Sequence, residues 1–184
     1  MTKEEILYSY KDAEKCSDID WDLWEPDDTE RCVLSYIVDE ENDRMLFIEK
    51  LRGMGTGLLN GPGGHIEPGE DPVAAAAREI KEETGLDVRA EDLEERAMLS
   101  FQFRDGMRMG GRVYYCRKWS GELIDRSDET IPRWYDRKDV DYSRMWEDDV
   151  LWLPDFLAGK SFWGRFIFDG QKLIDSSIIY YGEK

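Results

Sequence analysis

Residues 64–86 read GHIEPGEDPVAAAAREIKEETGL, and this stretch carries the strongest local structural signal in the chain. Asp71 is a good N-cap residue, and Pro72 suits the first turn of a helix. Four consecutive alanines have the highest helix propensity, and Gly85 suits a left-handed C-terminal cap. The pattern therefore predicts a helix from about Pro72 to Thr84.

The predicted helix has two distinct faces. At about 100° per residue, one face collects apolar side chains that can pack on a sheet, namely Val73, Ala76, Ala77 and Ile80. Another face, rotated by roughly 130°, collects the carboxylates of Glu79, Glu82 and Glu83. Arg78 lies one turn before Glu82 and can hold its carboxylate in place.

Three carboxylates at this spacing supply the hard oxygen ligands that Mg²⁺ prefers alongside water and substrate phosphate oxygens. The glycines before the helix allow close approach of the backbone, and Gly63 can offer its carbonyl oxygen to the same metal. Taken alone, however, the string REIKEE is more often a solvated acidic helix face. The helix by itself leaves both interpretations open.

Composition and charge limit the class of protein. A chain of 184 residues is long enough for one well-packed domain. The formal net charge of −17 disfavours nucleic acid polymers and anionic membranes as partners. There is no long apolar run and no signal-peptide pattern, so no membrane span is expected. Three cysteines without a CxxC pair predict reduced thiols and a cytoplasmic protein.

The rest of the chain predicts strands around the helix. Strand-like runs occur at residues 32–38, 44–50, 96–103, 112–119 and 132–137, and residues 162–181 predict a hairpin with its turn at Asp169-Gly170. Residues 145–159 look partly helical. Strands with helices at two places predict an α/β or α+β sandwich around one sheet. The first thirty residues hold eleven acidic and three basic side chains, which predicts an acidic segment appended to a domain spanning residues 31–184.

The 23-residue stretch resembles the signature of the Nudix hydrolase family at every fixed position. The spacing is Gly, five residues, Glu, seven residues, then Arg-Glu-apolar-any-Glu-Glu-any-Gly-apolar. The matching residues are Gly64, Glu70, Arg78, Glu79, Ile80, Glu82, Glu83, Gly85 and Leu86. The resemblance implies the Nudix sandwich, with a loop-helix-loop beside a mixed sheet. It also implies hydrolysis of a nucleoside diphosphate linked to a further group X, with Mg²⁺ or Mn²⁺ as cofactor.

Charge explains why this chemistry needs carboxylates. Attack of water on a diphosphate builds negative charge, which divalent cations held by acidic side chains neutralise. One carboxylate can also accept the proton of the water. In the family that base is a glutamate of the signature or an acid from another loop. Glu129, in the string SDETIPRWY, is the candidate for the second case, and an ordinary acidic turn is the alternative. Glu70 is expected to brace the loop.

Three other stretches concern the group X. LNGPGG contains Asn60, MWEDD contains Trp146 beside two aspartates, and FQF places two phenylalanines on one face of a strand. An indole can stack on a base, and amides or carboxylates can read its polar edge. Adjacent aspartates titrate together, so that one of them can keep a proton. Core packing of the aromatic residues and a solvated acidic turn are the alternatives.

Together these stretches resemble a Nudix subfamily of the animal MutT type, which acts on oxidised purine nucleoside triphosphates such as 8-oxo-dGTP. The likeness implies release of the nucleoside monophosphate and pyrophosphate. It assigns substrate contacts to Asn60, Trp146, Asp148, Asp149, Lys50, Phe101, Phe103, Gly64 and His65. It assigns metal contacts to Gly63, Glu79, Glu82, Glu83 and Glu129, with Arg78 beside them in the catalytic set. Pro62, His65 and Met54 depart from the subfamily pattern, and these departures concern base preference more than chemistry.

Two alternatives to this function remain. In the first, the chain is a Nudix hydrolase whose substrate is ADP-ribose, a nucleotide sugar or a dinucleoside polyphosphate. In the second, the chain is a Nudix-fold binding module without turnover. The intact glutamates argue against the second alternative. The expected partner is a small nucleotide, with no nucleic acid polymer and no membrane, and the expected oligomeric state is a monomer.

Overall fold

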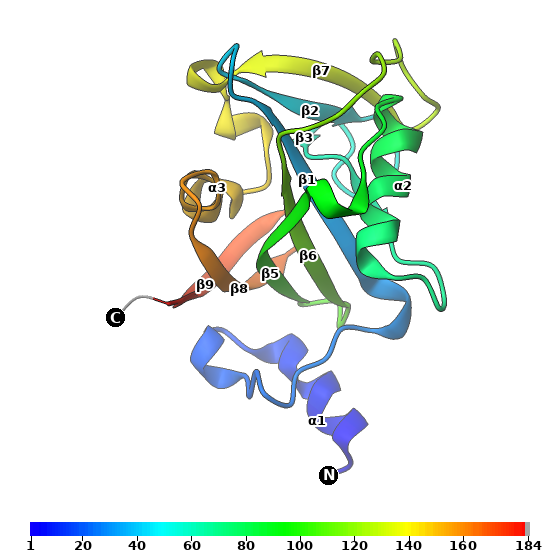
Figure 1. The fold of residues 1–184 in the computed structure, drawn as a ribbon. Helices are drawn as coiled ribbons and strands as arrows, with labels where there is room; N and C mark the ends of the chain where they lie inside the picture. The colour runs from blue at the N-terminus through cyan, green and yellow to red at the C-terminus, as the bar shows by residue number, and fades with distance from the viewer. Residues whose placement is uncertain (183–184) are drawn as a thin grey trace. The chain divides into compact units, whose positions relative to one another are not determined.

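The computed structural model describes residues 1–182 (Figure 1). The chain divides into two compact units. Unit 1 comprises residues 1–31, residues 97–111 and the described residues from Glu147 onward, and unit 2 comprises residues 32–96 and 112–146. The predicted boundary between residues 30 and 31 stays a prediction.

Three α-helices separate runs of two to four strands along the described chain. The helices are α1 (Lys3–Ser9), α2 (Pro72–Thr84) and α3 (Asp149–Leu157). The strands are β1 (Arg31–Asp39), β2 (Arg44–Lys50), β3 (Leu59–Asn60), β4 (Gly63–His65), β5 (Leu93–Phe103), β6 (Arg108–Cys116), β7 (Thr130–Asp136), β8 (Ser161–Asp169) and β9 (Lys172–Tyr181). No helix within residues 1–182 is long and apolar enough to cross a membrane.

In unit 2, the paired strands β1 and β2 carry the shorter strands that lead to α2. β1 and β2 are antiparallel, as the sequence predicts, and β2 also pairs with β3 and β7. β4 pairs with β1 in a register that places Val33 opposite Gly64. Because β4 lies just before α2, this pairing fixes the glycine loop from which the helix starts.

The predicted central helix is confirmed with both of its caps. The Asp71 side chain accepts a hydrogen bond from the Val73 N–H at 2.9 Å. Gly85 adopts φ 81°, and its N–H donates to the Lys81 carbonyl oxygen at 2.9 Å. The apolar face packs on the sheet strands in one core, which includes Val33, Ile37, Leu46, Ala75, Ala76 and Ile80. The helix is therefore fixed at its ends by its own sequence and along one face by the sheet.

Unit 1 contains the C-terminal strands β8 and β9. β8 pairs in parallel with β5 and antiparallel with β9. The predicted hairpin turn is confirmed, since Asp169 pairs with Lys172 and Gly170 adopts φ 58°. α3 confirms the expected helix in residues 145–159. Parallel and antiparallel pairs together confirm the α+β class with a mixed sheet.

The acidic N-terminal segment packs inside unit 1. Trp21 and Trp24 are buried, and their ring centroids are 5.5 Å apart. The Trp24 indole N–H donates to the Gln102 side-chain oxygen at 3.1 Å. The same core includes Leu7, Tyr10, Ala13, Cys16, Ile19 and Ile167. The segment thus contributes apolar side chains to a core that also contains β8.

Candidate functional site

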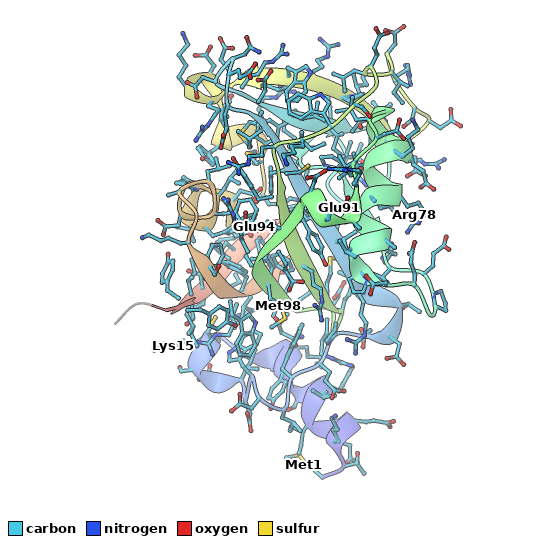
Figure 2. All side chains as sticks on the ribbon, in the orientation of Figure 1. Met1, Lys15, Arg78, Glu91, Glu94 and Met98 are labelled. Atoms are coloured by element: carbon cyan, nitrogen blue, oxygen red, sulfur yellow. The ribbon has the colours of Figure 1, made fainter. Side chains whose placement is uncertain are left out.

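Arg78, which is labelled in Figure 2, lies on α2 and makes several polar contacts. Its guanidinium makes two parallel hydrogen bonds of 2.9 Å to the carboxylate of Glu70. It also bonds Glu79 at 2.7 Å and Glu82 at 3.2 Å, which confirms the predicted pairing one turn apart. Its remaining N–H group donates to the backbone carbonyl of His65 at 3.0 Å. One arginine therefore ties the helix to the loop that precedes it.

Glu70 braces this loop, as the sequence predicts. Hydrogen bonds from Arg78 and from the Glu67 N–H lower the pKa of Glu70 to about 2. The carboxylate consequently stays ionised at neutral pH and keeps both contacts. The role of Glu70 is to hold the loop before α2 in its conformation.

Glu83 is the most deeply buried carboxylate of the set, with 4% of its surface exposed. Its oxygen accepts a hydrogen bond from the Gly63 N–H at 2.8 Å. Burial raises the pKa of Glu83 to about 8, with smaller contributions from the charges of Glu79 and Glu129, and the Lys50 ammonium opposes the shift. Glu79, Glu129 and Lys50 therefore all act electrostatically on Glu83.

Glu79 and Glu82 differ in exposure although they share a helix face. The Glu79 side chain is 13% exposed and that of Glu82 is 58% exposed. The pKa of Glu79 is raised because its burial outweighs the opposing effect of the Arg78 guanidinium. The three glutamates therefore form a gradient from the buried Glu83 to the solvated Glu82.

Two glycines beside these carboxylates have no room for a side chain. A Cβ atom on Gly63 would lie 2.2 Å from the Val33 carbonyl oxygen. A Cβ atom on Gly64 would lie 2.6 Å from the Glu79 carboxylate. Side chains at either position would displace the loop or the glutamate, so the site requires glycine here for close approach.

The donor set fits a hard divalent cation, since it offers several carboxylates within a glycine cradle. Within residues 1–182, no three acidic, histidine or cysteine side chains stand together as a formed metal cage. The contacts explain this, because Arg78 engages Glu79 and Glu82 while the Gly63 N–H engages Glu83. A cation at this place would take over carboxylate oxygens that protein donors now hold.

Glu129 precedes β7 at the end of a loop in unit 2. Its carboxylate pairs with the Arg52 guanidinium, which holds the pKa of Glu129 below its usual range. The next residue, Thr130, donates a side-chain hydrogen bond to the Glu83 carbonyl at 3.1 Å. The structure thus brings Glu129 to the signature helix, whereas its catalytic role stays a prediction.

Two of the expected base-contacting residues lie in unit 2. The Asn60 side-chain oxygen accepts hydrogen bonds from the Tyr36 hydroxyl at 3.3 Å and from the Gly61 N–H at 2.9 Å. Trp146 is half-buried, and its indole nitrogen lies 3.0 Å from the place of a Cβ atom on Gly55. Gly55 therefore lets the RGMG loop approach the indole closely.

The other expected base-contacting residues lie in unit 1. Asp148 and Asp149 are buried, and the Trp152 indole N–H donates to Asp148 at 2.8 Å. Burial raises the pKa of Asp148 to about 6. Phe101 and Phe103 stack on two phenylalanines of β8, with ring centroids 5.5 and 5.8 Å apart. The two rings therefore make core contacts, which were the alternative to base contact in the sequence analysis. Their contact with a base stays a prediction.

The geometry around the signature helix agrees with a comparison of the sequence with known families. The model of the NUDIX domain matches residues 28–156, which is more than half of the chain. The chain belongs to the Nudix family.

Curated Nudix relatives are similar over most of their length. An oxidized purine nucleoside triphosphate hydrolase of Danio rerio is 36% identical over 143 residues, covering 77% of this chain and 90% of the relative. The hydrolase of the same name from Mus musculus is 32% identical over 131 residues, covering 71% and 83%. A solved MutT structure from Bacillus halodurans shares the fold, with a TM-score of 0.71 at 24% identity, covering 84% of this chain and 99% of that one.

Two contacts of this Nudix site escape prediction from the sequence. The ion pair of Arg52 with Glu129 joins residues 77 positions apart, and the hydrogen bond of Tyr36 to Asn60 joins β1 to β3, two strands that each pair with β2. A signal exists for Arg52, because it lies next to Lys50 in a glycine-rich loop, a common composition for phosphate binding. No local pattern marks Tyr36.

Proposed function

We propose that this Nudix chain hydrolyses oxidised purine nucleoside triphosphates, using Mg²⁺ or Mn²⁺. Water adds across the phosphoanhydride bond, which yields the nucleoside monophosphate and pyrophosphate. The observation that carries the proposal is the buried Glu83, which accepts a hydrogen bond from the Gly63 N–H and shares α2 with Glu79 and Glu82, the two glutamates that Arg78 holds. The names of the relatives from fish and mouse support the choice of substrate.

The residues of the site have separable tasks in this reaction. Arg78 and the Gly63 N–H hold the three glutamates in place before the site is loaded. Lys50 adds positive charge near Glu83 and Glu129, where phosphate charge would otherwise be opposed by carboxylates. A bound divalent cation supplies charge neutralisation and a more acidic water. Glu83 or Glu129 would be the carboxylate that accepts a proton from the attacking water.

The base would be read by polar and aromatic side chains outside the helix. We propose this role for Asn60, Trp146, Asp148 and Asp149, and also for Phe101 and Phe103. A protonated carboxyl group donates a hydrogen bond and an ionised one accepts, so a coupled aspartate pair can present both. Such a pair can match the altered edge of an oxidised purine.

We further propose that the protein is a cytoplasmic monomer acting on small nucleotides, with no nucleic acid polymer or membrane as partner. The net charge of −17 supports the exclusion of nucleic acid polymers and anionic membranes, because it repels polyanions and anionic surfaces. Light scattering coupled to gel filtration should give the mass of one chain, 21.6 kDa. A mass of twice that value would remove the monomer from the proposal.

A substrate panel tests the function. The full chain is assayed with Mg²⁺ and with Mn²⁺ on 8-oxo-dGTP, 2-hydroxy-dATP, dGTP and ADP-ribose, with kcat/KM measured for each. We expect a modified purine triphosphate to be the best substrate and to yield pyrophosphate. Equal rates for all triphosphates, or a preference for ADP-ribose, would contradict the proposed substrate.

The substitution Glu83→Gln tests the site. We expect it to lower kcat by about 10²-fold or more, the range typical of a lost catalytic proton acceptor or metal ligand, with little change in nucleotide affinity. Glu122→Gln is the matched control, since Glu122 is an exposed glutamate of unit 2. If Glu83→Gln kept full turnover, the carboxylate would have no part in the reaction.

A further inference from the structure

The ion pair between Arg52 and Glu129 is not needed to hold the fold. The Arg52 side chain is 64% exposed and that of Glu129 is 49% exposed. Exposed pairs of this kind contribute little to stability, because water screens them and two long side chains lose freedom. The pair can therefore open at small cost.

The backbone under this pair is fixed. The Leu51 N–H donates to the Glu129 carbonyl at 2.8 Å, and Lys50 pairs with Thr130 across β2 and β7. The loop after Leu51 is closed by the Gly57 N–H, which donates to the Lys50 carbonyl at 2.7 Å. Opening the pair then requires only that side chains rotate.

Glu129 also lies within reach of a second set of partners. Its negative charge acts on Glu79 and on Glu83, and the Lys50 ammonium acts on Glu83 and Glu129 alike. Turned to Arg52, the carboxylate is neutralised by a guanidinium. Turned the other way, it would add a carboxylate to the acidic cluster of α2. Because the hydroxyl of the adjacent Thr130 donates to the Glu83 carbonyl at 3.1 Å, rotation of the Glu129 side chain from Arg52 towards α2 would have the opposite consequence for a cation.

The guanidinium of Arg52 has a second use when Glu129 leaves it. An arginine fork binds carboxylates and phosphates with the same two-point geometry. Arg52 also lies two residues after Lys50, at the start of a glycine-rich loop. A phosphate group can replace the carboxylate as its partner.

We propose that Arg52 restrains Glu129 until a divalent cation is bound, and then binds a phosphate oxygen of the substrate. This inference rests on the proposed function, whose substrate carries a triphosphate. Arg52 acts on the metal site through Glu129, as a positioning residue. It acts on the substrate directly, as a phosphate ligand.

Metal binding without nucleotide tests the first half. Mn²⁺ affinity of the full chain is measured by electron paramagnetic resonance for the wild type, Arg52→Gln and Arg89→Gln. Arg89 is the matched control, because its side chain is 68% exposed and pairs with Asp92 at 2.9 Å, so that the same charge is lost. We expect Arg52→Gln to bind Mn²⁺ about two- to fivefold more tightly than Arg89→Gln, the range that an exposed ion pair allows.

A double-mutant cycle assigns this effect to Glu129. In a Glu129→Gln background, Arg52→Gln should leave Mn²⁺ affinity equal to that of the matched Arg89→Gln variant in the same background, because there is no restrained carboxylate left to release. Equal affinity of Arg52→Gln and Arg89→Gln in the otherwise native chain would overturn the restraint. So would a gain that persists without the Glu129 carboxylate.

Affinity for inorganic tripolyphosphate in the presence of Mn²⁺ tests the second half. We expect Arg52→Gln to weaken this affinity about tenfold, as the loss of charged hydrogen bonds predicts, and Arg52→Lys to restore it in part. Unchanged affinity would overturn the phosphate contact. This probe has no base and needs no turnover, so its outcome is independent of the substrate panel, where a failure of the proposed function would show.

Discussion

Single glycines shape the site more than their size suggests. Gly64 leaves room for the Glu79 carboxylate, which lies 2.6 Å from the position of a missing Cβ atom. That carboxylate is held there by Arg78. A methyl group at residue 64 would have to push Glu79 off the guanidinium or move the loop.

We therefore expect Gly64→Ala to lower kcat/KM at least tenfold and to weaken Mn²⁺ binding, because the added methyl group displaces the Glu79 carboxylate. The control is Gly111→Ala, where an added Cβ meets no atom within 4 Å. Steady-state kinetics and metal titration check both variants. Equal activity of Gly64→Ala and the control would show that Glu79 can move without consequence.

Burial of Asp148 makes its contribution to the unfolding free energy depend on pH. Its pKa is raised to about 6 by burial, above the ordinary value of 3.8. Between these two values the folded chain holds a proton that the unfolded chain has released. The contribution of Asp148 to the unfolding free energy therefore falls as pH rises from about 4 to about 6, and it is flat above that range.

The substitution Asp148→Asn should remove this contribution. Relative to the wild type, the variant should gain unfolding free energy as pH rises from 4 to 6, by an amount on the order of 3 kcal/mol at most. Urea unfolding at several pH values measures the difference, and Asp125→Asn, at an exposed loop residue, is the control. Parallel curves for Asp148→Asn and the wild type would contradict the assignment.

The same variant should change relative rates across the substrate panel if Asp148 reads the base.

At the scale of elements, the N-terminal segment behaves as part of unit 1. Trp24 reaches the side chain of Gln102 on β5, which is fully buried, and Gln102 also donates to the Phe103 carbonyl at 3.0 Å. Residues 101 and 103 flank this glutamine. The segment thus supports the strand that carries two of the proposed base-contacting rings.

Removal of this one hydrogen bond should be measurable. Trp24→Phe keeps an aromatic ring but leaves the buried Gln102 oxygen without its indole donor, which should cost about 1–3 kcal/mol of unfolding free energy. Tyr8→Phe is the control from the same segment, because its side chain is 61% exposed. Urea unfolding followed by circular dichroism compares them. If both variants were equally stable, the contact would not support β5.

At the scale of the whole molecule, charge opposes compaction. The chain carries 42 acidic and 25 basic side chains, which gives the net charge of −17. Repulsion of this kind is weakened by salt, since the screening length falls to about 10 Å at 0.1 M. The folded state should therefore gain more from added salt than the expanded unfolded state does.

We expect the Tm at pH 7.5 to rise by roughly 3 °C between 0.02 and 0.3 M KCl, which corresponds to about 1 kcal/mol for a chain of this length. Differential scanning calorimetry measures this shift. Near pH 4.5, the isoelectric point of the sequence, the shift should vanish. A Tm that falls with salt at pH 7.5 would mean that attractive ion pairs outweigh the net repulsion.

The sequence by itself determined α2, its caps, the identity of its carboxylates and the family. These features depend on contacts within a few residues, and helical periodicity places such residues in space without knowledge of the rest of the chain. The hairpins of β1 with β2 and of β8 with β9 follow from short turns for the same reason.

Tertiary structure alone decided which glutamate is buried and what each one contacts. Glu83 is buried and Glu82 is solvated because the sheet covers one side of α2 more fully than the other. The pairs of Arg52 with Glu129 and of Trp24 with Gln102 join residues 77 and 78 positions apart. Sequence spacing carries no information about such contacts, because the packing of distant strands brings them together.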